Sequence, residues 1–156
     1  MGAEQSSEII IKKLRKGGET LKIPVLTKSE ETLMMFLWNR GKPLSVQEMI
    51  DSWGGYERTW KDNHMRVIVR ALVEKGALEI AELDYHNSRA SRRLRPTFSM
   101  KEYYAQVMKR GGLTASEMVE AEAVALAQKG DKEGMSALIR DLKGIIEEYA
   151  MRDDTE

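Results

Sequence analysis

The chain has 156 residues, and its 25 basic side chains balance its 25 acidic ones. Its length allows one compact core with an additional element, and 42% hydrophobic and 32% charged residues predict a folded protein. The lack of cysteine excludes disulfides and thiolate metal sites. Because no apolar run approaches about 18 residues and no signal-type leader is recognisable, we expect a cytoplasmic protein that does not span a membrane.

The balanced total conceals an uneven distribution of charge along the chain. Residues 1–57 carry 8 basic and 8 acidic side chains, residues 58–98 carry 9 and 5, and residues 99–156 carry 8 and 12. The three segments therefore have formal charges of 0, +4 and −4. This distribution is typical of an anion-binding module joined to a separate acidic element, and chance scatter is the alternative explanation.

The first clear helix signals follow a basic N-terminal arm, which we place at residues 1–24. Segments 27–30 (TKSE) and 45–48 (SVQE) both have capping-box spacing, in which a hydroxyl and a carboxylate satisfy free backbone amides. The first box predicts a helix over about 28–39, and the second opens a short helix that ends at Gly54.

The third expected helix, over about 61–75, is the most regular, because its apolar residues form one narrow stripe and leave the opposite face polar. Residues 77–83 alternate as a half-buried strand, and residues 93–98 alternate as a second one. The intervening residues 84–91 are expected to form a turn-rich loop. Three short helices followed by two strands with an arginine-rich tip predict a winged helix.

The rest of the chain is expected to be helical. Capping patterns predict helices over about 99–110 and 114–129, and a last helix over about 132–151 carries an apolar stripe with heptad spacing. We expect this stripe to form a two-fold dimer interface; packing within one chain is the alternative. The stripe consists of Met135, Leu138, Ile139, Leu142, Ile145, Ile146 and Tyr149.

Motifs of enzymes are missing from the sequence. It has no phosphate-binding glycine loop, no H-E-x-x-H pattern and no nucleophile elbow. Neither His64 nor His86 has a second His or a carboxylate three or four residues further along the chain, so we expect no metal site. We therefore expect neither an enzyme nor a cofactor. Trp38 and Trp53 lie on apolar stripes and are assigned to the core.

The elements of a DNA-binding protein are present. The outward face of the third helix would read base edges in the major groove, and cationic or hydroxyl side chains beside it would contact phosphates. The candidate base readers are Asn63, His64, Arg66, Val67 and Arg70. The candidate backbone contacts are Thr59, Lys61, Arg89, Arg92, Arg93 and Arg95. A solvated surface charge is the alternative for any single arginine, but stability alone hardly requires four within seven residues of the wing.

Three stretches carry a family resemblance: residues 26–38, 43–50 (PLSVQEMI) and 60–78, the last of which ends in LVEKGAL. They resemble the penicillinase repressor family of bacterial winged-helix repressors, which control β-lactamase, methicillin-resistance and copper-transport genes. The resemblance covers roughly residues 25–110, and the acidic tail is similar in layout to the family's dimerisation region. It implies a homodimer that binds an inverted-repeat operator, with the helix that begins near Asp62 as the reader.

The expected organisation is thus an arm at 1–24, a winged helix-turn-helix domain at 25–98 and a helical dimerisation region at 99–156. Lys61-Asp62 replaces the Ser-Pro or similar pair of the family, so base preference does not transfer. The copper-responsive branch has a cysteine-rich metal site, and the antibiotic-responsive branch is cut at an Asn-Phe bond; this chain has neither. A sensor or protease partner therefore stays unidentified.

Two functions compete at this point. The first is a repressor that binds double-stranded DNA. The second is a winged-helix module that has lost DNA binding and docks a protein through its tail or arm. An exposed hydrophobic wing would favour the second, whereas the arginine-rich wing sequence favours the first.

Overall fold

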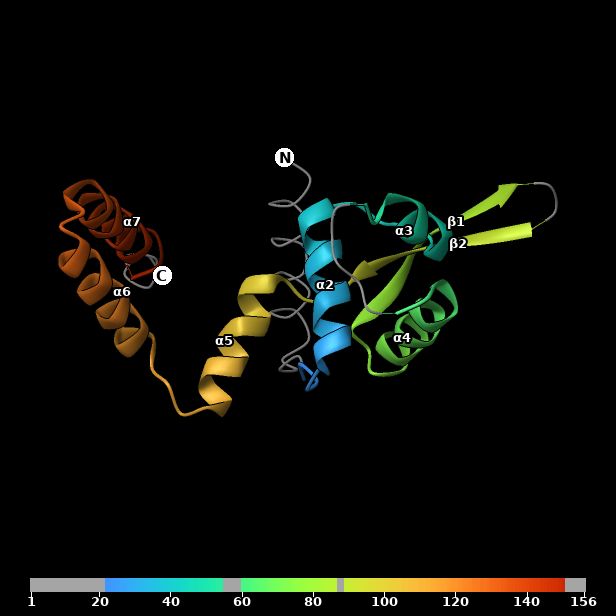
Figure 1. The fold of residues 1–156 in the computed structure, drawn as a ribbon, viewed down its shortest axis with the longest axis horizontal. Coiled ribbons are helices and arrows are strands. Elements are labelled where there is room, and N and C mark those ends of the chain that lie inside the picture. Colours follow the sequence, from blue (N-terminus) through green and yellow to red (C-terminus); the bar gives the residue numbers. More distant parts are fainter. Residues whose placement is uncertain (1–21, 55–59, 87–88, 151–156) are drawn as a thin grey trace, which may run out of the picture. The chain divides into compact units, whose positions relative to one another are not determined.

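The computed structural model describes residues 22–54, 60–86 and 89–150. The chain forms two compact units, the first extending to Gln106 and the second beginning at Val107. The elements in order are α2 (Lys28–Arg40), α3 (Val46–Ser52), α4 (Asp62–Glu74), β1 (Leu78–His86), β2 (Arg89–Pro96), α5 (Met100–Arg110), α6 (Ala115–Lys129) and α7 (Lys132–Ala150) (Figure 1). Three helices, a two-stranded wing and further helices make up the predicted winged helix-turn-helix fold with a helical C-terminal region. Of the expected arm, residues 1–21 lie outside the described ranges.

Hydroxyl caps begin the helices where the sequence predicts them. At α2 the capping box is complete, because Glu30 N donates to Thr27 Oγ1 at 3.2 Å and Thr27 N donates to Glu30 Oε1 at 2.8 Å. Ser45 Oγ accepts a hydrogen bond from the amide of Glu48 at 3.1 Å and so caps α3. Such a cap stabilises a helix end by about 1 kcal/mol, which fixes where each helix begins.

The core of the first unit lies between α2, α4 and the inner part of the wing. α2 contributes Leu33, Met34, Phe36 and Leu37, and α4 contributes Met65, Ile68, Val69 and Leu72. The sequence pattern also placed Val73 on the apolar stripe of this helix, but Val73 is 41% exposed. Trp53 is buried, and Trp38 packs half-buried against the core.

A partly buried ion pair joins α2 to the end of α4. The carboxylate of Glu30 is buried and pairs with the ammonium group of Lys75. Burial raises the pKa of the Glu30 carboxyl, but hydrogen bonds from Lys75 and Thr27 outweigh burial and lower the pKa overall. The carboxylate therefore stays ionised and holds the C-terminal end of α4 in place.

The wing is longer than the sequence predicted. β1 and β2 pair antiparallel from Leu78–Pro96 to His86–Arg89, so most of the expected loop at residues 84–91 belongs to the strands. A bulge between Ile80 and Glu82 shifts the register inside the predicted strand, and pairing then continues beyond the predicted strand end at residue 83. The hairpin extends well beyond the helices of the first unit (Figure 1).

A short backbone bridge attaches the wing to the segment before α3. Leu44 N donates to Leu94 O at 3.1 Å, and Leu94 N donates to Leu44 O at 2.9 Å. Leu94 is buried, so this bridge marks the point where the wing leaves the core.

Two tyrosines attach the first half of α5 to α2. Tyr103 Oη donates to Glu31 Oε2 at 3.0 Å, and Tyr104 Oη donates to Glu31 Oε1 at 2.9 Å. The indole of Trp38 donates to Phe98 O at 2.9 Å in the same aromatic cluster. These contacts place the beginning of α5 in the first unit, whereas the sequence-based domain limit lies before this helix.

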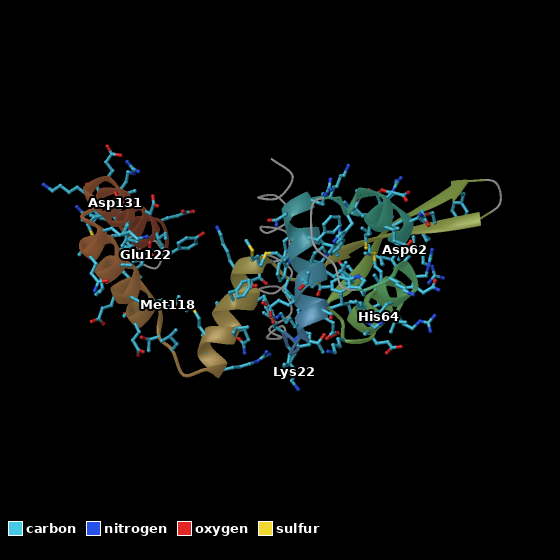
Figure 2. All side chains as sticks on the ribbon, viewed as in Figure 1. Lys22, Asp62, His64, Met118, Glu122 and Asp131 are labelled. Atoms are coloured by element: carbon cyan, nitrogen blue, oxygen red, sulfur yellow. The ribbon has the colours of Figure 1, made fainter. Side chains whose placement is uncertain are left out.

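The second unit contains a helical hairpin of α6 and α7. Gly130 ends α6 with φ of 67°, and Asp131 starts α7 by accepting a hydrogen bond from Gly134 N at 2.8 Å. Figure 2 labels Asp131 at this turn. Neither helix contains a buried residue, so the hairpin lacks a core of its own within the described chain.

The two glycines of α7 should respond to alanine in opposite ways. A Cβ at Gly134 would lie 2.5 Å from Asp131 Oδ2 and 2.7 Å from Leu126 Cδ2, so the ends of both side chains, including the capping carboxylate of Asp131, would have to shift. A Cβ at Gly144 meets nothing within 4 Å. Since alanine favours a helix by about 1 kcal/mol over glycine, Gly144→Ala should stabilise the protein.

We expect Gly134→Ala to be less stable than Gly144→Ala by about 1–2 kcal/mol, because loss of the cap and strain offset the helix propensity. Urea unfolding followed by circular dichroism at one protein concentration measures the difference. Equal stabilisation by both changes would show that α6 and α7 do not approach closely at Gly134.

Candidate nucleic-acid interface

The five candidate base readers lie exposed on α4. The buried side of the helix faces the core through Met65, Ile68, Val69 and Leu72. The exposed residues are Asn63, His64, Arg66, Val67 and Arg70. Figure 2 labels Asp62 and His64 at the beginning of this helix. The sequence pattern therefore predicted correctly that these five residues lie on the exposed side of α4. Their roles in binding stay predictions.

The cations of α4 are free to meet an external anion. Lys61, Arg66 and Arg70 are exposed, and none forms an ion pair with a carboxylate of the described residues. Lys61 is the N-cap residue, and its side chain makes no capping hydrogen bond. The partial positive charge of the helix N-terminus thus lies beside an unpaired ammonium group.

An open hollow of about 440 Å³ lies at this end of α4. It is lined by Ser29, Trp60, Lys61, Asn63 and His64. The side chains that line it include a hydroxyl, an amide, an imidazole and an ammonium group, all of which are able to donate hydrogen bonds to an oxyanion such as a backbone phosphate. Ser29 and Trp60 were not among the residues predicted for this surface, because in the sequence Ser29 is recognisable only as part of a capping pattern.

The wing arginines differ in their surroundings. Arg95 Nε pairs with Glu79 Oε1 at 2.8 Å across the two strands. Arg93 donates through Nε to Glu48 Oε1 at 2.9 Å and through Nη1 to Glu82 Oε2 at 3.3 Å. Both side chains therefore form ion pairs within the protein. The expectation that stability does not require these arginines did not take such pairs into account.

The remaining candidate backbone contacts are less fully described. Arg92 is exposed and has no carboxylate partner among the residues that the structure describes. Only the backbone of Arg89 is described, as the first residue of β2, and Thr59 lies outside the described ranges.

The ion pair between Arg93 and Glu48 also affects the ionisation of Glu48. The hydrogen bond from Arg93 lowers the pKa of the Glu48 carboxyl, and partial burial, which raises the pKa, offsets only part of this effect.

The other side of the wing is apolar. Ile80, Leu83 and Tyr85 are 47%, 53% and 71% exposed, and Arg92 lies directly across from Leu83. The bulge brings the three apolar side chains to one face, which the strict alternation assumed for the sequence did not predict. The wing thus combines paired charges on one face with exposed apolar side chains on the other.

The predicted dimerisation stripe lies on α7. Met135, Leu138 and Leu142 are half-buried. Its other four members are between 47% and 62% exposed: Ile139, Ile145, Ile146 and Tyr149. An exposed apolar surface of this kind on a helix that lacks buried residues is typical of an interface.

Among the described residues, no group of three or more His, Cys, Asp or Glu side chains could hold a metal ion. Within the same ranges, no helix has the length and apolar character needed to cross a membrane.

A helix-turn-helix formed by α3 and α4, an exposed outer face on α4 and a β-hairpin wing define a winged-helix regulator of transcription. The chain belongs to the penicillinase repressor family, whose sequence model, described as "Penicillinase repressor", matches residues 26–147. This match includes every described helix and both strands apart from the last residues of α7. The family is regulatory rather than enzymatic. No curated protein and no solved structure matches the chain significantly.

Proposed function

We propose that the protein is a sequence-specific repressor that binds an inverted-repeat operator in double-stranded DNA as a homodimer. The observation that carries this function is the outer face of α4, where Arg66 and Arg70 are exposed and have no carboxylate partner in the described chain. Unpaired guanidinium groups on an exposed helix beside a wing suit the major groove. A cytoplasmic location follows for a repressor of bacterial genes.

Base readout belongs to α4. Arg66 and Arg70 suit the O6 and N7 acceptors of guanine, Asn63 suits adenine, and Val67 suits a thymine methyl group. His64 lies at the edge of the same surface and adds a further donor or acceptor.

Contacts with the DNA backbone belong to the two sides of this helix. Lys61 lies at its uncapped N-terminus, and Arg92 is the unpaired arginine of the described wing side chains. For Thr59 and Arg89, the proposed contact with the DNA backbone rests on the sequence alone. Arg95 reaches DNA only with the donors that its ion pair leaves over, whereas the guanidinium group of Arg93 is already bound to two carboxylates.

A second copy of the chain is the natural cover for the exposed stripe of α7. Two copies related by a two-fold axis would bury Ile139, Ile145, Ile146 and Tyr149 against the same residues of the other chain. A two-fold protein recognises a site with the same symmetry, which is an inverted repeat. We assign no surface of the described residues to a sensor or protease that would release the repressor.

Arg70→Ala and Arg92→Ala should weaken DNA binding in different ways. Loss of a base contact at Arg70 should cost about 1–3 kcal/mol on the operator and relax one base position. Loss of a phosphate contact at Arg92 should weaken all sequences alike and lower the salt slope by about 1. Fluorescence anisotropy with operator, mutated operator and unrelated duplex, each over a salt series, measures both effects.

Glu74→Gln is a suitable control, because Glu74 is exposed on the same helix at its far end. It should leave base preference unchanged. Equal losses for Arg70→Ala on every sequence would remove Arg70 from the base readers.

The function itself is tested by selecting genomic DNA fragments with the purified protein at about 150 mM salt, where non-specific binding is weak. Sequencing of the bound fragments should reveal one enriched inverted repeat. No enrichment, with only salt-sensitive binding, would contradict the repressor.

One observation favours the second candidate, a winged-helix module that docks a protein. Ile80, Leu83 and Tyr85 expose apolar area on the wing, and Arg93 and Arg95 are already paired with carboxylates. Replacement of Leu83 and Tyr85 by serine distinguishes the two. A DNA-binding repressor should keep its base preference, whereas a docking module should lose its protein partner.

A further inference from the structure

The outer part of the wing has few attachments to the body of the protein. Leu94 is buried where the wing leaves the core, but Leu83 and Tyr85 further out are 53% and 71% exposed. The hairpin projects past the helices (Figure 1). Its direction therefore depends on the contacts made close to the bulge.

Arg93 makes those contacts. It lies next to Leu94, whose backbone bonds to Leu44 immediately before α3. Its guanidinium group donates to Glu48 on α3 at 2.9 Å and to Glu82 on β1 at 3.3 Å. One side chain thus links the first helix of the helix-turn-helix to both strands of the wing.

We propose that Arg93 is a positioning residue, which fixes the wing on α3 through Glu48 and Glu82, rather than a contact with a DNA phosphate. The role rests on the proposed DNA binding, because a fixed wing matters where Arg92 and α4 must engage one duplex at the same time. A planar guanidinium group suits this task, since it holds two carboxylates in a defined geometry.

Glu48→Gln separates positioning from phosphate contact by the sign of its effect. Glutamine keeps the size of the side chain and suits the capping position, but it removes the charge that holds Arg93. The substitution also makes the surface one charge more positive. A phosphate contact at Arg93 predicts tighter DNA binding, whereas positioning predicts weaker binding despite the added charge.

Glu79→Gln is the matched control. It makes the same change in charge and frees Arg95, but the Glu79–Arg95 pair lies within the hairpin and has no link to α3. We expect Glu48→Gln to weaken operator binding about threefold to tenfold with an unchanged salt slope, and Glu79→Gln not to weaken it.

Arg93→Ala should weaken operator binding to a similar extent, again without the fall of about 1 in salt slope that loss of a phosphate contact produces. The double variant Glu48→Gln/Arg93→Ala should bind no more weakly than Arg93→Ala alone, because both changes remove the same link. Thermal unfolding establishes that each variant is folded at the temperature of the titration.

Three outcomes overturn the inference. Tighter binding by Glu48→Gln, or a lower salt slope for Arg93→Ala, would make Arg93 a phosphate contact. Unchanged affinity of Glu48→Gln, with or without a lower melting temperature, would limit the link to stability. If the unaltered protein selects no DNA sequence, the proposed function fails together with the inference, whereas the first two outcomes leave that function standing.

Discussion

Replacement of Ile139 and Ile146 by glutamate should convert the protein from a dimer into a monomer and abolish operator binding. Both side chains are about half exposed or more in the single chain, so their loss should not unfold it. Each isoleucine contributes roughly 1–1.5 kcal/mol to the stability of the dimer when the partner covers it. A two-fold interface contains four of these side chains, two from each chain. The dimer should therefore weaken by about 4–6 kcal/mol, which corresponds to roughly 10³- to 10⁴-fold in its dissociation constant.

Sedimentation velocity measures the change in assembly, and anisotropy with operator duplex measures the change in binding. Arg140→Glu is a matched control, because it lowers the charge of α7 by the same two units on the side away from the stripe. This control should remain a dimer. A double variant that stays dimeric would place the interface elsewhere, and a monomer with full operator affinity would contradict binding to an inverted repeat.

Phe98→Ala should destabilise the first unit by about 3–5 kcal/mol, a large part of the roughly 5–15 kcal/mol that holds such a domain together. Phe98 is 1% exposed, and its ring centroid lies 6.2 Å from that of Trp38 and 6.0 Å from that of Tyr103. Removal of this ring leaves a cavity where β2, α2 and α5 meet. Collapse around it would disturb the hydrogen bond from Trp38 to the Phe98 carbonyl.

Urea unfolding at a fixed protein concentration measures this loss, since dimer formation would make stability depend on concentration. Leu83→Ala, on the exposed face of the wing, serves as the comparison and should change stability by less than about 0.5 kcal/mol. Similar losses for both variants would mean that the outer wing is packed in solution.

The helices could be predicted from the sequence because their signals are local. The capping hydroxyls of Thr27 and Ser45 bond to amides three residues away, so the short segment itself contains both partners. The apolar period of α4 likewise separated the buried Met65 and Leu72 from the exposed Arg70. The family resemblance, carried by α2 to β1, added the class of function.

The length of the wing could not be predicted, because it depends on pairing between strands. The bulge between Ile80 and Glu82 breaks the period of two on which the strand limits were based. Beyond it, pairing continues to His86 and Arg89, where the sequence reads as a loop. The same register shift placed Leu83 and Tyr85 on the face of the wing that Ile80 also occupies.

Spacing within one segment was enough to predict the starts of the helices, the exposed cations of α4 and the apolar stripe of α7. Which wing arginines pair with carboxylates depends on contacts that form only in the folded protein. Arg93 meets Glu48 across 45 positions of the chain, and Arg92, its neighbour, meets no carboxylate in the described part. An ion pair over that separation exists because the fold brings β2 against α3, and no local sequence pattern predicts it.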